Sequence, residues 1–410
     1  MESMKTAIAL VVCFFSAQAL RASDWPQFGG PLRDGVSTET GLLKQWPESG
    51  PKLIWMSKDV GLGYSGPAIV GGRIYLMGLR GESELLLCLN AADGKELWAT
   101  PIGSAYTNDY GDGPRGTPTV DGERIYMLGA NGDLVCAGTA SGTVHWRVKV
   151  TDFGGMVPPW GYCESVLVDG DRVVCTPGGE KGAMAAFEKL SGKLVWQSAK
   201  FTDPAQYASI AAADIAGTHL YIQVTGEHVT GIAAADGRML WQQPFKCAYV
   251  CASPVVKGDH VFVTSGGGTG CKSFHVLAPD KVELVYKNKV MKNLPGGVVL
   301  FGEHLYGYSD GLGWVCQHFA TGEQVWASKE FRKGSLTIAD GMMICVAEDD
   351  GTVVLADASE KGWKERSHFQ LDPLFTKRKQ GHVWTLPVVV GGRLYLRDQE
   401  FLFCFDIAAH

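Results

Sequence analysis

Short apolar runs broken by glycine-containing turns follow one another along the chain from about residue 66 to its end. Typical runs are "AIVGGRIYL", "VLVDGDRVVC" and "VVVGGRLYL", in which Gly-Gly or Asp-Gly separates two segments with alternating apolar residues. These dipeptides tolerate positive φ and are typical of β-hairpin turns. Each run therefore predicts two antiparallel strands.

A second phrase, a turn followed by an aromatic residue, recurs between the hairpins, as in "NAADGKELW" and "ATGEQVW". Its aromatic residues lie 37 to 50 residues apart. A period in this range with short strands indicates β-propeller blades of four strands, A to D, with the aromatic residue on strand D filling the gap between neighbouring sheets. The docking aromatic residues predicted in this way are Trp55, Trp98, Trp146, Trp196, Trp241, Tyr286, Trp326 and Trp363.

The two ends of the repeat complement each other. The last unit, "TLPVVVGGRLYLRDQEFLFCFDIAAH", lacks a fourth strand, whereas residues 51–56 resemble a strand D with no A, B or C before it. Pairing the two would complete the last blade and remove an exposed sheet edge. We therefore predict an all-β, eight-bladed β-propeller of four-stranded antiparallel blades over residues 51–410, preceded by an N-terminal extension at 23–50.

Residues 1–22 have the pattern of a secretory signal peptide. Lys5 precedes an apolar run from Ala7 to about Phe15, and small residues suitable for cleavage follow at Ala19 and Ala22. No later segment approaches twenty consecutive apolar residues, so no membrane span is predicted. The expected location is the periplasm or the extracellular medium.

Charge and motifs exclude several classes of function. The formal net charge is −6, and the single basic run is "KRK" at 377–379, so a nucleic-acid partner is not expected. The chain has no His-Glu-x-x-His, no Cys-x-x-Cys and no Gly-x-Ser-x-Gly motif, so neither a zinc enzyme nor a serine hydrolase is indicated.

Eight of the eleven cysteines form two groups. Four of them occupy the same place in different repeats and are interpreted as buried packing residues: Cys88, Cys136, Cys316 and Cys404. The pairs that could form disulfides are Cys163 with Cys175 and Cys247 with Cys251.

The turn-and-tryptophan phrase resembles the repeat of pyrroloquinoline quinone (PQQ) proteins, over residues 51–410. The stretches "DWPQFGGPLRDGVS" and "WGYCES" are similar to secreted bacterial PQQ-binding-like propellers. Relatives with this fold include quinoprotein alcohol dehydrogenases, which hold PQQ above a calcium ion and carry a disulfide of adjacent cysteines, and an outer-membrane assembly scaffold without a cofactor. This sequence contains no Cys-Cys dipeptide.

In a propeller the D-to-A and B-to-C loops share one face around the central channel, where we expect the functional site. The longest such segments are 101–116, 151–165 and 371–384. One hypothesis is an aromatic platform with a carboxylate at the channel mouth; the alternative is loops that only pack on their neighbours. The candidate cofactor-binding residues are Arg115, Trp160, Tyr162, Glu164, His382 and Trp384.

Arg115 has two interpretations, binding of an anionic ligand or an ion pair with Glu164. A calcium ion would draw on Glu164 and Asp310, whereas solvated acidic turns are the alternative. Further carboxylates expected on this face are Asp109, Asp112, Glu348, Asp349 and Asp350.

Two functions follow from these observations. The first is a monomeric, non-catalytic scaffold that binds a protein partner or a small-molecule or carbohydrate ligand through its loop face. The second is a PQQ- and calcium-dependent dehydrogenase that oxidises an alcohol or a sugar.

Overall fold

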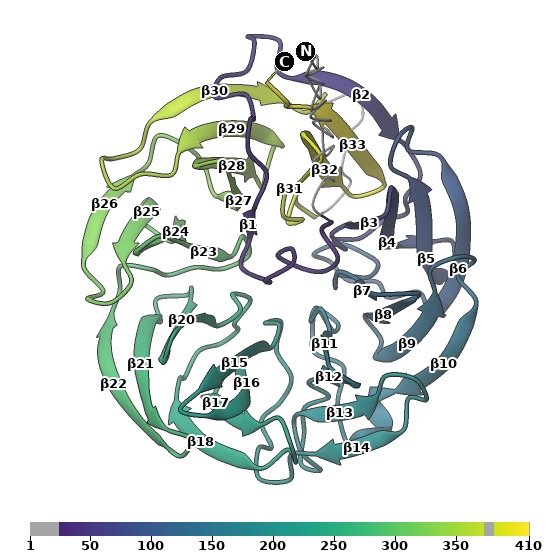
Figure 1. Cartoon of the computed structure of the whole chain (residues 1–410), viewed down its shortest axis with the longest axis vertical. Coiled ribbons are helices and arrows are strands. Elements are labelled where there is room, and N and C mark those ends of the chain that lie inside the picture. The colour runs from purple at the N-terminus through teal and green to yellow at the C-terminus, as the bar shows by residue number, and fades with distance from the viewer. Residues whose placement is uncertain (1–23, 373–380, 410) are drawn as a thin grey trace, which may run out of the picture.

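The computed structural model describes residues 24–372 and 381–409, and it confirms the all-β, eight-bladed propeller (Figure 1). Each blade is a four-stranded antiparallel sheet, and sheet order follows chain order in seven of the eight blades. The helical structure in the described part is a single 3-10 turn at Val150–Phe153. The signal peptide predicted at 1–22 and the basic run at 377–379 lie outside the described residues.

The first four blades run in chain order as follows. Blade 1 has β3 (Ala68–Val70), β4 (Arg73–Arg80), β5 (Ser83–Asn90) and β6 (Glu96–Ser104). Blade 2 has β7 (Thr119–Asp121), β8 (Arg124–Leu128), β9 (Asp133–Gly138) and β10 (Val144–Lys149). Blade 3 has β11 (Leu167–Asp169), β12 (Arg172–Cys175), β13 (Ala185–Glu188) and β14 (Leu194–Gln197). Blade 4 has β15 (Ala211–Ile215), β16 (Thr218–Val224), β17 (His228–Ala233) and β18 (Met239–Pro244).

The remaining blades complete the ring. Blade 5 has β19 (Val255–Lys257), β20 (His260–Ser265), β21 (Gly270–Ala278) and β22 (Lys281–Asn288). Blade 6 has β23 (Val298–Phe301), β24 (His304–Ser309), β25 (Gly313–His318) and β26 (Gln324–Ser328). Blade 7 has β27 (Gly334–Ala339), β28 (Met342–Ala347), β29 (Thr352–Asp357) and β30 (Glu365–Gln370), with β1 (Val36–Ser37) added in parallel beside β27. Blade 8 has β31 (Val388–Val390), β32 (Arg393–Asp398), β33 (Phe401–Asp406) and β2 (Lys52–Ser57).

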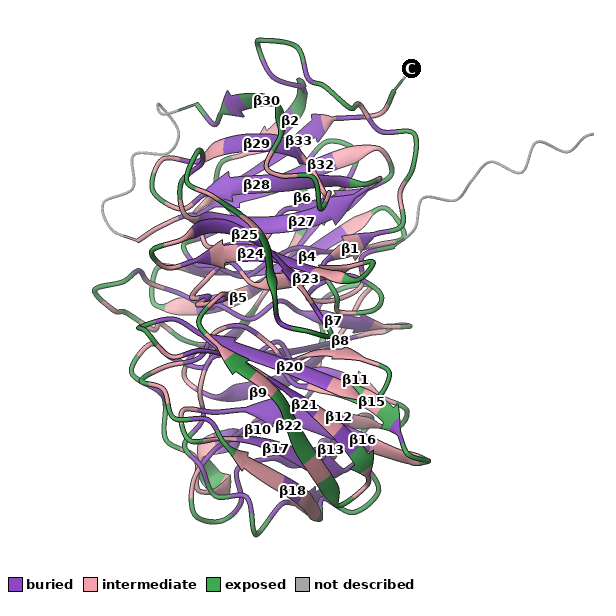
Figure 2. Cartoon of the chain, turned by 90° about the vertical axis from the view of Figure 1, so that its left-hand side faces the viewer, coloured by how far each residue is buried: buried purple, intermediate pink, exposed green. Residues whose placement is uncertain are grey.

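The N-terminal strand closes the ring as predicted. Strand β2 pairs antiparallel with β33, and Trp55 lies opposite Cys404. The middle strands of the blades are buried, whereas an outermost strand such as β22 has most of its side chains exposed or half-buried (Figure 2). The core is therefore a series of apolar layers between neighbouring sheets.

The recurring aromatic residues lie between neighbouring blades. Five of them donate a hydrogen bond to a backbone carbonyl of the next blade: Trp55 to Ala91, Trp146 to Lys189, Trp196 to Ala234, Tyr286 to Phe319 and Trp326 to Ser359. At four of these five interfaces, those of Trp55, Trp146, Trp196 and Tyr286, a turn glycine of the next blade lies against the ring. A Cβ atom on Gly94 would lie 2.4 Å from a ring atom of Trp55, and one on Gly237 would lie 2.4 Å from Trp196. Within one turn-and-aromatic phrase, the glycine therefore contacts the preceding blade and the aromatic residue contacts the next blade.

The assignment of Trp363 as the strand-D aromatic residue of blade 7 is wrong. Trp363 precedes β30, and the position that pairs with β29 where other blades have their aromatic residue is Ser367, opposite Leu355. Trp363 packs instead on Trp326, with ring centroids 6.4 Å apart. Spacing along the chain selected the nearest tryptophan, whereas the strand register places it outside the sheet.

A tryptophan from the N-terminal extension occupies the gap between blades 7 and 8. Trp46 is buried in one apolar cluster with residues of both blades, and its ring centroid lies 5.3 Å from that of Phe369. Its backbone N–H donates to Ser367 Oγ at 2.9 Å. The extension therefore supplies the aromatic residue that strand D of blade 7 lacks.

The extension also crosses the central channel on the face of the A-to-B hairpins. Trp25 forms a two-hydrogen-bond bridge with Ile69 of blade 1, and β1 reaches β27 of blade 7 (Figure 1). Between them, the Arg33 guanidinium donates to the carbonyl oxygens of Ser165 and Val166. The segment from 25 to 37 thus connects blades 1, 3 and 7 across the channel. Within the part of the chain described, no helix has the length and apolar character needed to cross a membrane.

Candidate binding cavity at the channel mouth

A cavity of about 820 Å³ occupies the central channel. Its wall includes the N-terminal segment Trp25 to Gly35 at one end and the D-to-A loops at the other. Every blade contributes a residue from just before its strand A to the mouth, and these eight residues, the mouth ring, are Tyr64, Arg115, Cys163, Tyr207, Cys251, Pro295, Lys333 and Trp384.

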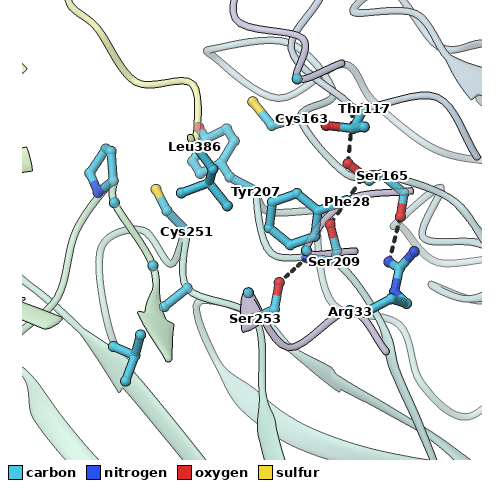
Figure 3. A pocket seen from close by; sticks show the side chains of 18 of the residues that line it. Phe28, Arg33, Thr117, Cys163, Ser165, Tyr207, Ser209, Cys251, Ser253 and Leu386 are labelled. Atoms are coloured by element: carbon cyan, nitrogen blue, oxygen red, sulfur yellow. Dashed lines mark hydrogen bonds between the residues drawn. The ribbon is translucent and has the colours of Figure 1, made fainter. Parts of the chain in front are cut away.

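The mouth ring follows from the alternation of side chains in an extended chain. Residues two apart point to the same side, so Cys163 and Ser165 both line the cavity, as do Cys251 and Ser253. The hydroxyl groups below the ring link neighbouring blades. Ser165 Oγ accepts from the Thr117 N–H at 2.8 Å, Ser209 Oγ from the Ser165 N–H at 3.0 Å, and Ser253 Oγ from the Ser209 N–H at 3.0 Å (Figure 3). These bonds hold the wall of blades 2 to 5 in place.

On one side of the mouth, Trp160 is the centre of an aromatic cluster. Its ring centroid lies 4.9 Å from Tyr207, 5.1 Å from Tyr249 and 5.5 Å from Tyr110. All four residues line the cavity. Aromatic side chains present large contact surfaces with few rotatable bonds, which suits them to binding.

On the other side, Trp384 joins aromatic and charged groups. Its ring lies 5.0 Å from that of Tyr64 and stacks on His382 at 4.9 Å. Its indole N–H donates to Glu348 Oε2 at 2.8 Å. Lys333 Nζ lies 3.7 Å from the Glu348 carboxylate, so a cation and an anion lie beside the same tryptophan.

Arg115 forms the third charged position of the mouth. Its guanidinium donates to the carbonyl oxygens of Gly111 and Gly113 and lies 4.8 Å from the Tyr106 ring centroid and 5.5 Å from that of Tyr64. Its side-chain hydrogen bonds are to carbonyl groups, the carboxyl group of Glu84 is close enough to interact with its charge, and stacking on two rings fixes its position. The predicted ion pair with Glu164 is absent among the ion pairs of the described residues.

Comparison with known proteins gives the family. The family model described as outer membrane protein assembly factor BamB matches residues 42–128 and 82–280, together more than half of the chain. The chain belongs to this family. The curated outer membrane protein assembly factor BamB of Salmonella typhimurium is 22% identical to this BamB-family chain over 357 residues, which cover 74% of the chain and 88% of the relative.

Solved structures agree on the fold of this BamB-family propeller. BamB from Moraxella catarrhalis has a TM-score of 0.61 at 16% identity, covering 84% of this chain and 95% of its own. Quinohemoprotein alcohol dehydrogenase from Comamonas testosteroni has a TM-score of 0.64 at 10% identity, covering 96% and 82%. At these identities the likeness shows the fold alone.

Two of the six predicted cofactor-binding residues do not line the cavity of the BamB-family chain. Tyr162 is buried, and its hydroxyl donates to the Pro177 carbonyl at 2.9 Å. Glu164 is 2% exposed, and its Oε2 accepts from the Thr176 N–H at 2.7 Å. Both side chains point into the blade because Cys163 and Ser165, at the alternate positions, take the channel side. The prediction of which side chains face the channel was therefore wrong by one residue in this segment.

Burial also changes the ionisation of the glutamates of this region. Desolvation raises the pKa of Glu164 to about 8, although the Thr176 N–H and the positive charge of Arg33 oppose the rise. In blade 1, burial raises the pKa of Glu84 to about 7. Glu164 is thus a structural group whose nearby cation comes from the N-terminal segment.

The carboxylates do not fit the calcium ion that the family resemblance implies. Asp310 lies 3.8 Å from Lys333 Nζ, while Glu164 is enclosed in blade 3. Asp349 and Asp350 both pair with Arg332, and Asp112 accepts from the Asn108 N–H. Over residues 24–372 and 381–409, no three carboxylate, histidine or cysteine side chains converge at the mouth. Calcium needs six to eight oxygen ligands, so we assign it no site.

Some cysteines pack inside the blades, whereas Cys163 and Cys251 line the cavity. Cys88, Cys136, Cys316 and Cys404 are buried, as the repeat indicates. All ten cysteines in the described residues are free thiols, so neither candidate disulfide is formed.

The sequence did not lead us to the mouth-ring residues Tyr64, Tyr207, Cys251, Pro295 and Lys333. Each of them stands two residues before a small residue that faces the channel. Aligning the starts of strand A in the different blades would reveal this pattern. Of the segment predicted at 371–384, His382 and Trp384 line the cavity, and residues 373–380 lie outside the described part.

Proposed function

We propose that this BamB-family propeller is a non-catalytic, monomeric scaffold of the periplasm or the extracellular medium that binds a protein segment or a small ligand at the channel mouth. The observation that carries the proposal is the mouth ring, in which all eight blades contribute a residue to one cavity flanked by clustered aromatic side chains. Such a cavity combines apolar surface with a few fixed polar groups, the usual character of a binding site. The name of the curated relative, an assembly factor, supports a partner-binding role.

The charges of the mouth favour an occupant with both aromatic and acidic groups. Arg115, which is 9% exposed, and Lys333 are the cations that line the mouth. Lys333 lies near Asp310 and Glu348, and Glu348 also accepts a hydrogen bond from Trp384. A carboxylate of the occupant would meet Arg115, whose own bonds are to neutral carbonyl groups, while its apolar part would contact Trp160 and the surrounding tyrosines.

The test is a selection for ligands followed by a comparison of variants. The purified protein would be used to select binders from displayed random peptides and to screen a set of aromatic carboxylates and sugars. The affinity of the best binder would then be measured by fluorescence anisotropy. Trp160→Ala should weaken binding by about 30-fold, because central aromatic residues of a binding surface contribute about 2 kcal/mol or more. Lys333→Glu should weaken the binding of acidic ligands in addition.

The matched control is Leu190→Ala, which removes an exposed apolar side chain in the turn between β13 and β14, on the opposite face. This variant should bind like the parent. Binding that survives Trp160→Ala, or the absence of any binder from either class, would contradict the proposal. Melting temperatures of the variants would show that loss of binding is not loss of folding.

The second candidate is a PQQ-dependent dehydrogenase. It is favoured by the structural likeness to the quinohemoprotein enzyme and by the flat aromatic walls of the mouth. It requires a metal site that the described carboxylates do not form, so the scaffold remains the better-supported function.

A further inference from the structure

The first residue of strand B differs among the blades. Several blades have arginine at this position, and it bonds to carbonyl oxygens in the C-to-D turn of the next blade. Arg73 donates to the Thr139 carbonyl, Arg172 to that of Ala235 and Arg393 to that of Ala91. Blade 5 has His260 instead. Histidine is shorter than arginine and can be uncharged, so we expect it to have a different role from these arginines.

His260 belongs to a cluster in which two imidazoles meet one carboxylate. It lies directly opposite His275 in the β20–β21 pair, and the two rings stack with centroids 4.5 Å apart. Asp259, in the hairpin before β20, places Oδ1 2.6 Å from His260 Nδ1 and Oδ2 2.9 Å from His275 Nε2. The three potential ligand atoms all lie within 4.8 Å of one another.

A second carboxylate orients one of these imidazoles. Glu283 on β22 pairs in register with His275, and its Oε1 lies 3.5 Å from His275 Nδ1. A carboxylate on the far nitrogen fixes the ring and raises the basicity of the nitrogen that faces the ligand, which is the usual arrangement behind a metal-bound histidine.

We propose that Asp259, His260 and His275 form a surface site for a divalent transition-metal ion, of which zinc is the representative. Two imidazole nitrogens and a carboxylate oxygen suit zinc, with water at the fourth position. Ligand atoms bound to tetrahedral zinc at about 2.0–2.2 Å lie roughly 3.4 Å apart, so replacing the hydrogen bonds by a metal requires the side chains to separate by less than about 1 Å. Their partial exposure permits this movement. Calcium, which prefers oxygen ligands, should not bind here.

Blade 6 provides an internal control. Its His304 and His318 occupy the same register positions, and Glu303 corresponds to Asp259. The rings there are at 88°, and Glu303 is paired with Lys257 at 2.5 Å. Two histidines and a longer carboxylate side chain therefore occupy the corresponding positions of the neighbouring blade without converging on a single point.

The site lies on the face of the A-to-B hairpins, opposite the channel mouth. The metal-site proposal therefore does not depend on the proposed function. The experiment is calorimetric titration of the protein, purified without a polyhistidine tag, with zinc chloride at pH 7.5. We expect one saturable site, weakened at least 10-fold by His275→Gln and by Asp259→Asn. Glu283→Gln should weaken it about 10-fold through loss of the orienting carboxylate.

His304→Gln should bind zinc like the parent, and calcium chloride should give no heat of binding. The metal-free variants should melt like the parent, because the substituted side chains are partly exposed. Absence of saturable zinc binding would overturn the proposal. So would unchanged binding in His275→Gln, which would place the metal elsewhere, for example at the cavity thiols Cys163 and Cys251.

Discussion

At the scale of the residue, five interfaces between blades combine an aromatic ring from one blade with a turn glycine from the next. Trp196 donates its indole N–H to the Ala234 carbonyl and lies against Gly237. The glycine has a φ of +73°, and any side chain there would enter the ring. Glycine is therefore required twice at this position, for its backbone conformation and for the space it leaves.

These two requirements can be separated within blade 4. Gly217 has a φ of +74°, but a Cβ there would meet no atom within 4 Å. Gly217→Ala should cost about 1 kcal/mol from the left-handed backbone alone. Gly237→Ala should cost about 1–3 kcal/mol more because the methyl group displaces Trp196. Thermal unfolding of both variants measures the difference, and equal losses would contradict the packing role.

Glu164 gives the fold a dependence on pH. Burial raises its pKa from 4.5 to about 8, so the folded state holds the proton more tightly than the unfolded chain does. The stability that the protonated group contributes is complete below about pH 4.5 and is lost as the pH rises through about 8.

Glu164→Gln should remove this dependence, since glutamine stays neutral and retains an oxygen for the Thr176 N–H. The melting temperature of the variant relative to the parent should therefore rise between pH 5 and pH 8. Glu84 is unchanged in both proteins and cancels in the comparison. A difference in melting temperature that stays constant with pH would contradict the assigned burial of the charge.

At the scale of the element, the N-terminal extension is part of the propeller core. It crosses the channel, adds β1 to blade 7 and then supplies Trp46 to the gap between blades 7 and 8. Strand β2 follows and completes blade 8. One continuous segment thus joins the two ends of the ring.

The contribution of Trp46 can be measured directly. Trp46→Ala should lower the free energy of unfolding by about 3–5 kcal/mol, the usual cost of removing a large buried aromatic side chain. Leu32→Ala in the same extension removes a side chain that is 78% exposed and should change stability by less than about 0.5 kcal/mol. If both variants unfold like the parent in urea, the extension is not a structural part of the ring.

At the scale of the whole molecule, the sequence was sufficient for the architecture. Hairpin dipeptides, the aromatic period and the complementary ends at 51–56 and 385–410 are local patterns, and the pairing of β2 with β33 follows from them. The cavity was harder to predict. Strand A has only three residues in several blades, so the side on which Tyr162 and Glu164 lie depends on a loop whose register the sequence does not reveal.

The path of the extension and the role of Trp46 depend on contacts between residues several hundred positions apart, such as the hydrogen bond of Trp46 with Ser367. No local pattern indicates such contacts. The same reason explains why Trp363, correctly spaced along the chain, was wrongly assigned to strand D of blade 7.

The central claim is that the channel mouth is a binding surface of a scaffold and not the seat of a quinone cofactor. The most direct measurement is a titration of the purified protein with PQQ and calcium, followed by visible absorbance and heat, with dye reduction assayed on alcohols and sugars. We predict no saturable uptake and no dye reduction, because Glu164 is enclosed in its blade and Asp310 lies beside Lys333. Tight one-to-one binding of PQQ accompanied by dye reduction would contradict the account.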